Sequence, residues 1–120
     1  MKTLNELADA VHAQAWAKGW HSETEDLNAS LERACNNLHD EVSELHEAWR
    51  NGQLHEPCDK AAKMVEAGIA PLTCIEEEMA DIIIRSLDTA RKFKVDIQDA
   101  IERKHAFNAT RAFRHGGKRS

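Results

Sequence analysis

The chain has 120 residues, of which 31% are charged and 5% aromatic, and its formal net charge is −5 at pH 7. This length fits one domain, residues 1–120, with a modest core. The low aromatic content, the absence of Tyr and the scarcity of Pro and Gly argue against β-rich architectures and favour an all-α fold.

The charge is unevenly distributed along the chain. Residues 23–88 carry sixteen Asp or Glu and five Lys or Arg, whereas residues 91–120 carry three and nine. This distribution suits an acidic, metal-bearing body that binds a polyanion, and it also suits plain intramolecular charge pairing. A short basic tail without a recognised nucleic-acid motif gives no reason to expect DNA or RNA binding.

Targeting and redox features point to the cytoplasm. The sequence shows neither a signal peptide nor a run of about 18 apolar residues, so we expect a cytoplasmic protein with no membrane contact. Cys35, Cys58 and Cys74 are an odd number without CxxC spacing. We therefore expect reduced thiols and not a zinc site or a disulfide framework.

Apolar periodicity predicts four main helices. The first covers about residues 3–19, and the second covers about 27–50 and stops at Asn51-Gly52. Residues 51–72 contain Gly52, Pro57, Gly68 and Pro71 and predict a long irregular connection, with a short helix near 59–67.

The third main helix begins after Thr73, which forms a capping box with Glu76. The fourth covers about residues 96–110 and is followed by a basic, Gly-containing tail, residues 111–120. Long helices with short links predict an antiparallel bundle of four main helices. Trp49 lies on the apolar stripe of the second helix, and we expect it in the core.

Two acidic pairs carry most of the chemical information. Glu41-x-x-Glu44 and Glu78-x-x-Asp81 have i, i+3 spacing, which places each pair of Cβ atoms roughly 5–6 Å apart on a helix. Antiparallel packing would gather all four carboxylates, although unit charges about 5.5 Å apart repel by roughly 3 kcal/mol at an effective dielectric of about 20. A divalent cation would relieve this repulsion, and hard oxygen ligands favour Mg²⁺ or Mn²⁺ over Zn²⁺. The alternative is a solvated acidic face, although helical periodicity places Glu41 at the core edge.

The fourth helix carries a polar continuation of its apolar stripe. Ile97 and Ile101 are followed in register by Lys104, Asn108 and Arg111, and then by Arg114, His115 and Lys118. We expect this stripe to point inward, so that its cations and the amides of Gly116-Gly117 form an anion clamp. Carboxylates for a metal and cations for a polyanion suit chemistry on a nucleotide phosphate chain.

Three segments resemble MazG-type, all-α nucleotide pyrophosphohydrolases, and the similarity spans nearly the whole chain. They are Asp40-Glu41-Val-Ser-Glu44-Leu-His-Glu-Ala-Trp49, Glu77-Glu78-Met-Ala-Asp81-Ile-Ile-Ile-Arg85, and Lys104-His-Ala-Phe-Asn108-Ala-Thr-Arg111-Ala-Phe-Arg114-His115-Gly116-Gly117-Lys118. The stretch from His12 to Trp20 resembles the N-terminal helix end of that family.

The resemblance implies hydrolysis of NTPs or dNTPs to nucleoside monophosphate and pyrophosphate, often in nucleotide-pool house-cleaning. It implies Mg²⁺, with Mn²⁺ as an alternative, held by Glu41, Glu44, Glu78 and Asp81. It also implies a homodimer or homotetramer whose sites are completed near subunit interfaces. Two features depart from the family pattern: the separation of Glu44 from Glu78 is long, and Asp40 stands where some members have Glu.

We hypothesise the following roles. Glu41 or Glu44 orients or deprotonates the attacking water. Lys104 and Arg111 bind phosphates together with the tail residues Arg114, His115 and Lys118, and Asn108 fixes the orientation of the substrate. Trp20 could stack on a base, because aromatic faces suit nucleobases. His12 is expected to be a packing histidine.

Two other classes remain open. Glu102-x-x-His105 invites a ferritin-like di-metal carboxylate bundle, which needs this motif on two helices, whereas the chain has one. A non-catalytic helical module that binds a Mg²⁺–nucleotide complex would use the same acids and cations. The sequence alone does not separate this module from an enzyme.

Overall fold

The computed structural model describes residues 1–113 and 119, and this part of the chain is all-α, as predicted. Its helices, in chain order, are α1 (Leu4–Ala17), α2 (Leu27–Arg50), α3 (Ala61–Glu66), α4 (Cys74–Lys92) and α5 (Ile97–Ala109). The described residues form no strand, although Pro57 and Thr73 make an isolated antiparallel bridge. No helix among them is both long and apolar enough to cross a membrane.

Side-chain caps fix the helix starts close to the predicted positions. Thr3 and Thr73 form capping boxes with Glu6 and Glu76 at the starts of α1 and α4. An aspartate side chain accepts a backbone N–H at the start of each of two other helices, Asp26 at α2 and Asp96 at α5. These oxygens satisfy N–H groups that have no partner inside the helix.

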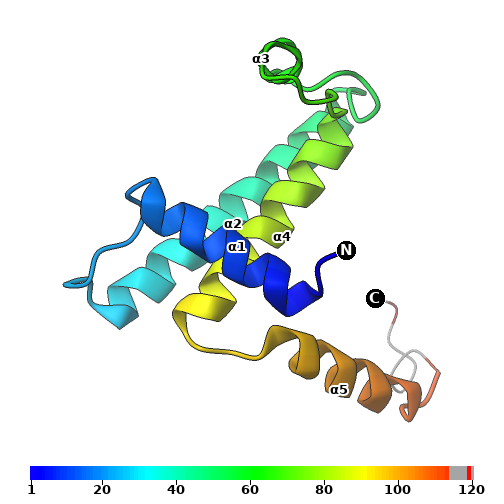
Figure 1. Ribbon diagram of the computed structural model, residues 1–120. Coiled ribbons are helices and arrows are strands. Elements are labelled where there is room, and N and C mark those ends of the chain that lie inside the picture. Colours follow the sequence, from blue (N-terminus) through cyan, green and yellow to red (C-terminus); the bar gives the residue numbers. More distant parts are fainter. Residues whose placement is uncertain (114–118, 120) are drawn as a thin grey trace.

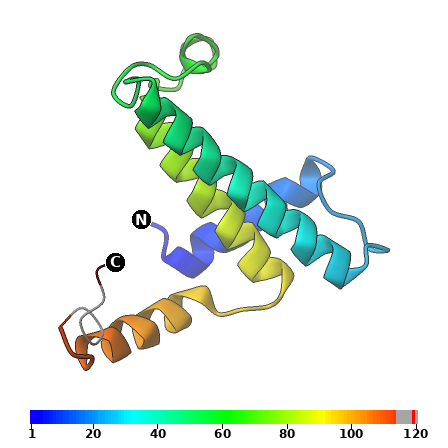
Figure 2. The ribbon, with the colours of Figure 1, turned by 180° about the vertical axis from the view of Figure 1, so that it is seen from behind.

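α2 and α4 form a long antiparallel pair, and α1 crosses this pair near the C-terminal half of α4 (Figures 1 and 2). The order of contacts defines the direction, because Glu41 of α2 meets Arg85 of α4 while Glu25, just before α2, meets Lys92. α1 is held on α4 by a hydrogen bond between His12 and Asp88 and by an ion pair between Arg91 and Asp9.

The connection between α2 and α4 is folded at the far end of the pair, with α3 at its tip (Figure 1). Its two ends are joined by backbone hydrogen bonds, from Cys58 N–H to Leu72 O and from Cys74 N–H to Glu56 O, both 2.9 Å. Cys58, which belongs to this connection, is buried. The segment predicted to be irregular is therefore an anchored excursion with a short helix, as expected near residues 59–67.

A tight turn directs α5 away from the α2–α4 pair (Figure 2). Lys94 follows α4 with φ +58°, and the N–H groups of Lys94 and Val95 bond back to the carbonyls of Arg91 and Ala90. This is the Schellman pattern, which usually places Gly at the left-handed position. α5 then packs against α1, where Asn5 Nδ2 donates to Asp96 Oδ1 at 2.8 Å.

The prediction that the polar stripe of α5 points inward is wrong for the single chain. Ile101 is 49% exposed, and Lys104 and Asn108 are exposed as well. The reason is that the turn at Lys94 carries α5 onto α1, so that its stripe does not face α2 and α4. A bundle of four helices packed side by side is accordingly not confirmed.

The core of the described chain is small. Its buried apolar residues are Ala8, Cys58, Leu87 and Ala90. Trp49, expected in the core, is 62% exposed and stacks on His46 one turn away. Apolar stripes that sequence periodicity assigns to a core thus remain partly open to solvent.

Candidate functional site

The two acidic pairs meet across the α2–α4 interface. α2 positions Glu41 and Glu44 on one face, and one carboxylate oxygen from each lies within 4.8 Å of the others and of an oxygen of Glu78 from α4. Asp81 follows one turn after Glu78, and the negative charge of Glu41 contributes to raising its pKa. Three of the four predicted carboxylates, those of Glu41, Glu44 and Glu78, therefore converge within a single chain, while Asp81 lies near this group without belonging to it.

Glu41 is buried, Glu78 half-buried and Glu44 exposed, and the burial of the first two makes this cluster electrostatically demanding. Glu41 is only 7% exposed, and its Oε1 accepts a hydrogen bond from Arg85 Nε at 2.7 Å. Its Oε2 and the Oε2 of Glu78 are buried without a hydrogen-bond partner. An unpartnered buried carboxylate oxygen is costly, and such atoms often mark a place for an ion.

The pKa values follow from this crowding. Burial, followed by the neighbouring Glu44 carboxylate, raises the pKa of Glu78 to about 7. Burial and Glu41 raise the pKa of Glu44, and burial and Glu41 also raise the pKa of Asp81. Without a cation the protein therefore reduces repulsion by keeping a proton among these groups near neutral pH.

The donor set fits Mg²⁺ or Mn²⁺. All four side chains offer carboxylate oxygens, which these hard cations prefer. Two of the oxygens, on Glu41 and Glu78, need a partner that no described protein group supplies. A divalent cation would also displace the proton that the raised pKa of Glu78 retains.

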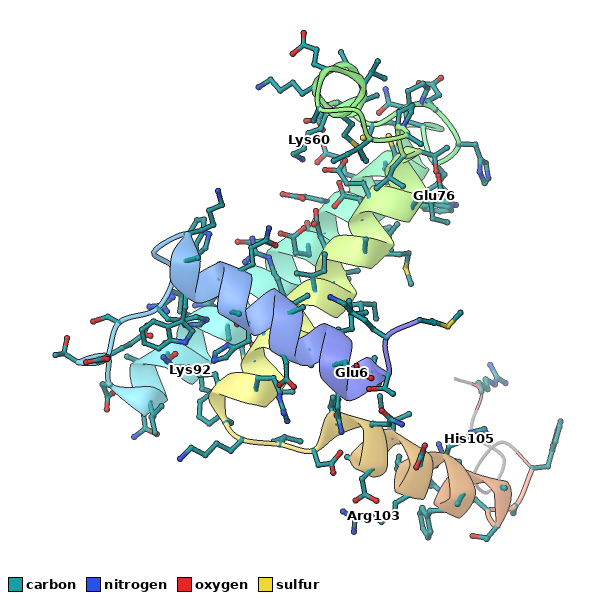
Figure 3. The ribbon with its side chains drawn as sticks, in the orientation of Figure 1. Glu6, Lys60, Glu76, Lys92, Arg103 and His105 are labelled. Carbon is teal, nitrogen blue, oxygen red and sulfur yellow. The ribbon has the colours of Figure 1, made fainter. Side chains whose placement is uncertain are left out.

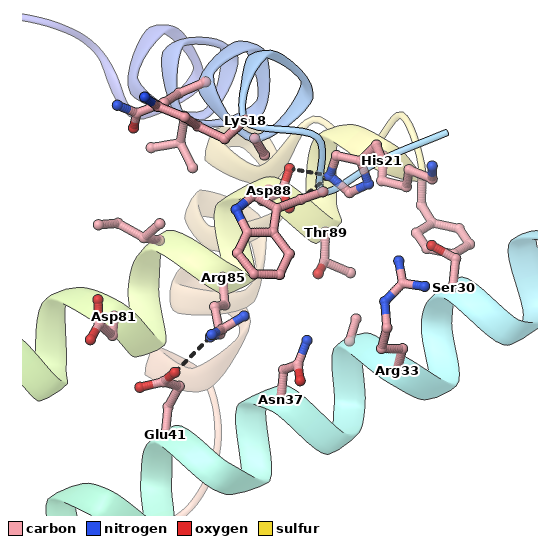
Figure 4. Close-up of a pocket in the computed structure, with 18 of the residues that line it drawn as sticks. Lys18, His21, Ser30, Arg33, Asn37, Glu41, Asp81, Arg85, Asp88 and Thr89 are labelled. Carbon is pink, nitrogen blue, oxygen red and sulfur yellow. Dashed lines mark hydrogen bonds and ion pairs between the residues drawn. The ribbon is translucent and has the colours of Figure 1, made fainter. Parts of the chain in front are cut away.

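The cluster opens onto a cavity of about 460 Å³ between α1, α2 and α4 (Figure 4). Glu41, Glu44 and Asp81 line its acidic end. Asn37 lies one helical turn from Glu41 on α2, and Arg33 one turn further. Trp20 lines the same cavity, as the proposed base-stacking role requires.

Cations flank this cavity at both ends. Figure 3 shows Lys60 beside the α3 excursion and Lys92 near the start of α2, at opposite ends of the α2–α4 pair. Lys60 pairs with Glu77 of α4. Lys92 Nζ lies 3.1 Å from Glu25 Oε2, and Arg33 pairs with the same carboxylate. Glu25 therefore neutralises part of the positive end.

Two histidines share one carboxylate on the cavity wall. His21 Nε2 lies 2.9 Å from Asp88, and His12 Nδ1 lies 2.7 Å from it. Trp16 Nε1 donates to His12 Nε2 at 3.1 Å, so neutral His12 must carry its proton on Nδ1 and donate it to Asp88. A metal on His12 Nδ1 would shift the ring proton to Nε2, where it would face the Trp16 N–H, so Trp16 would have to move. The geometry instead suits a hydrogen-bonded link between α1 and α4. His12 is thus a satisfied packing histidine, as predicted.

The predicted substrate residues of the C-terminal region lie elsewhere. Lys104 and Asn108 line a separate shallow depression on α5 with Ile101 and His105, and Arg111 lies just after that helix. Figure 3 shows His105 on α5, away from the acidic end of the cavity. Arg114, His115 and Lys118 lie outside the described residues.

Sequence reasoning missed several residues that the fold brings to the cavity. Arg85 ends the second segment that resembles the MazG-type family, but its pairing with Glu41 depends on helix register. Arg33 and Asn37 share the face of Glu41 at i−8 and i−4 and could have been found by extending that face. No sequence pattern pointed to Lys60, because it lies in the connection between α2 and α4.

Glu102 and His105, the other metal motif considered, are exposed on α5. They belong to neither of the metal-competent groups found among the described residues. Those groups are His12 with His21 and Asp88, and Glu41 with Glu44 and Glu78. Comparisons of the chain with known protein families, curated protein sequences and solved structures find no match.

Proposed function

We propose that this chain hydrolyses nucleoside triphosphates, NTPs or dNTPs, to nucleoside monophosphate and pyrophosphate. Glu41, Glu44, Glu78 and Asp81 would hold Mg²⁺ or Mn²⁺. The observation that carries the proposal is the acidic cluster with two unpartnered buried oxygens at one end of a 460 Å³ cavity. The sequence resemblance to MazG-type pyrophosphohydrolases supports the same reaction.

The cavity has the parts that a nucleotide needs beyond the acidic end. Asn37 offers both donors and an acceptor, and Trp20 offers an aromatic face. On α2 the rise of about 1.5 Å per residue places Asn37 about 6 Å and Arg33 about 12 Å from Glu41 along the helix axis. A phosphate chain at Glu41 would therefore have its sugar and base beside these side chains.

The bound metal would polarise phosphate oxygens, lower the pKa of a water molecule and neutralise developing charge. Arg85 holds Glu41 in place through one oxygen and leaves the other toward the cluster. Glu44, whose pKa is raised by burial and by Glu41, is the better-placed general base because Lys60 acts on it through charge alone, whereas Arg85 hydrogen-bonds Glu41.

The reaction balances with water as the sole co-reactant. The water oxygen forms a bond to a phosphorus of the α–β bridge, the bridging P–O bond breaks, and the water proton passes to Glu44. Nucleoside monophosphate and pyrophosphate leave. No electron acceptor or further group is required.

We also propose that a homodimer or homotetramer completes the bundle. Large apolar side chains on the stripes of the long helices are exposed, among them Val42 (51%), Met79 (45%) and Ile83 (47%). The chain exposes 9225 Å², whereas a monomeric globular protein of its mass exposes roughly 6,500 Å². A second copy could also bring its Lys104, Asn108 and Arg111 to the cavity.

The test is a panel of NTPs and dNTPs with Mg²⁺ or Mn²⁺, in which pyrophosphate and single phosphate are measured separately. We expect metal-dependent release of pyrophosphate. Glu41→Gln and Asp81→Asn should each reduce turnover by about a hundredfold or more, because each removes a metal ligand.

Glu47→Gln is the matched control, since Glu47 is exposed on α2 and does not line the cavity. Turnover of this variant should equal that of wild type. Release of single phosphates would contradict the reaction class. A nucleotide that binds tightly with Mg²⁺ and is never hydrolysed would support the non-catalytic module instead.

A further inference from the structure

The excursion between α2 and α4 delivers one cation to the acidic end of the cavity. Lys60 lies at the start of α3, where its Nζ pairs with Glu77 and lies 3.5 Å from Asp59 Oδ1. The side chain also lines the cavity together with Glu41, Glu44 and Asp81. Backbone hydrogen bonds at Cys58 and Cys74 fix the segment that carries it.

This ion pair is poorly explained as a stabilising device. The Lys60 side chain is 62% exposed, whereas that of Glu77 is 10% exposed. An ion pair with so exposed a lysine contributes little to stability, because solvent screens the attraction and the flexible side chain loses entropy. The arrangement instead keeps an accessible ammonium group at a defined place on the rim of the acidic cluster.

The local charge explains why a substrate would need that ammonium group. The acidic end holds five carboxylates and two cations, namely Glu41, Glu44, Glu77, Glu78 and Asp81 with Lys60 and Arg85. Three negative charges therefore remain when all these groups are ionised. A triphosphate carrying one Mg²⁺ is itself an anion, so a metal alone leaves substantial repulsion.

We propose that Lys60 binds the β- and γ-phosphates of the substrate and thereby selects for a polyphosphate chain over a monophosphate. This inference rests on the proposed nucleotide hydrolysis. It gives the excursion a role, since shortening the connection would remove this cation. Glu77 acts as the positioning residue that holds the ammonium group at the rim in the free protein.

The primary test is direct binding of inorganic tripolyphosphate with Mg²⁺, measured by calorimetry, because this probe has the phosphate chain and lacks the nucleoside. Lys60→Gln should weaken binding by about tenfold or more, as expected for loss of a charge-assisted hydrogen bond. Lys60→Arg should retain most of the affinity. Lys63→Gln, an exposed lysine of α3 outside the cavity lining, is the matched control and should bind as wild type does.

A purely structural role makes a different prediction. If Lys60 only compensates Glu77, then Lys60→Gln/Glu77→Gln should restore both the melting temperature and tripolyphosphate binding. Phosphate recognition predicts that the melting temperature stays close to that of wild type in Lys60→Gln and in this double variant, while both variants bind tripolyphosphate weakly. Equal tripolyphosphate affinity in wild type and Lys60→Gln would overturn the inference.

Kinetics separate this inference from the proposed function. For the nucleotide turned over fastest by wild type, Lys60→Gln should raise KM by about tenfold or more, while inhibition by the product monophosphate changes less than about twofold. Absence of turnover by wild type across the whole panel would reject the proposed function. The tripolyphosphate comparison would still decide the role of Lys60.

Discussion

Glu78 is the residue at which protonation and metal binding compete most directly. Its pKa is raised from 4.5 to about 7 by burial and then by Glu44. Between about pH 4.5 and about pH 7, Glu78 therefore binds more protons in the folded protein than in the unfolded chain. The contribution of Glu78 to stability is therefore fully present below about pH 4.5 and is lost as the pH rises through about 7.

The metal-free protein should accordingly melt at a lower temperature at about pH 8 than at about pH 5.5, since the raised pKa values of Glu44 and Asp81 act in the same direction. Mg²⁺ should raise the melting temperature more at the higher pH, because no proton has to be displaced. Differential scanning fluorimetry at both pH values, with and without Mg²⁺, measures this.

Glu78→Gln supplies the contrast for this prediction. It removes the ionisable group, so its melting temperature should depend less on pH and respond less to Mg²⁺. Glu47→Gln should behave as wild type does. A stabilisation by Mg²⁺ that is equal at both pH values, and unchanged in Glu78→Gln, would contradict the proposed link between this carboxylate and the metal.

The convergence of Glu41, Glu44 and Glu78 was predictable from the sequence, because i, i+3 spacing on a helix is local information. Glu41 at the core edge is confirmed by its burial. The cationic partners could not be assigned in the same way. Lys60 and Arg85 reach the cluster from a connection and from a facing helix, and these positions depend on helix register and loop path.

At the scale of elements, the capping box at the N-terminus of α4 also helps to position the acidic cluster. The Thr73 side chain accepts the Glu76 N–H, and the Glu76 carboxylate accepts the Thr73 N–H. Glu77 and Glu78 follow directly after Glu76 in the chain. α1 begins with the same capping box, built from Thr3 and Glu6, at a place remote from the acidic cluster.

This duplication gives a matched prediction. Thr73→Ala and Thr3→Ala should each lower the free energy of unfolding by about 1 kcal/mol, because each leaves a helix N–H group without its side-chain acceptor. Only Thr73→Ala should also weaken Mg²⁺ binding, because fraying of α4 displaces Glu78. Urea denaturation and a Mg²⁺ titration measure the two effects. Equal Mg²⁺ affinity in both variants would show that the cap acts on stability alone.

Helix positions were predictable from capping boxes and from terminal Asn-Gly, which are local signals. The path of α5 was not, because the turn that directs it contains Lys94 at φ +58° where Gly is usual. Apolar periodicity likewise identified the apolar stripes of the helices, but it does not show which element or which second chain covers each stripe. Trp49 lies on such a stripe and remains open in the single chain.

At the scale of the whole molecule, the single chain is too open for its mass. Its radius of gyration is 16.9 Å, whereas a compact domain of this length has roughly 13.6 Å. Its surface exceeds that of a typical monomer by more than about 2,000 Å². This excess is large enough for the interfaces of an obligate homo-oligomer.

We therefore predict that light scattering gives about two or four times the chain mass of 13.5 kDa. Ile83→Lys, on the apolar stripe of α4, should shift the mass toward 13.5 kDa and reduce nucleotide turnover, because burying a lysine in an apolar interface is costly. Val65→Lys, at an exposed apolar residue of α3 (60% exposed, against 47% for Ile83), should leave both the mass and the turnover unchanged. A wild-type mass of 13.5 kDa at every concentration tested would show that the chain is a monomer and would contradict this prediction.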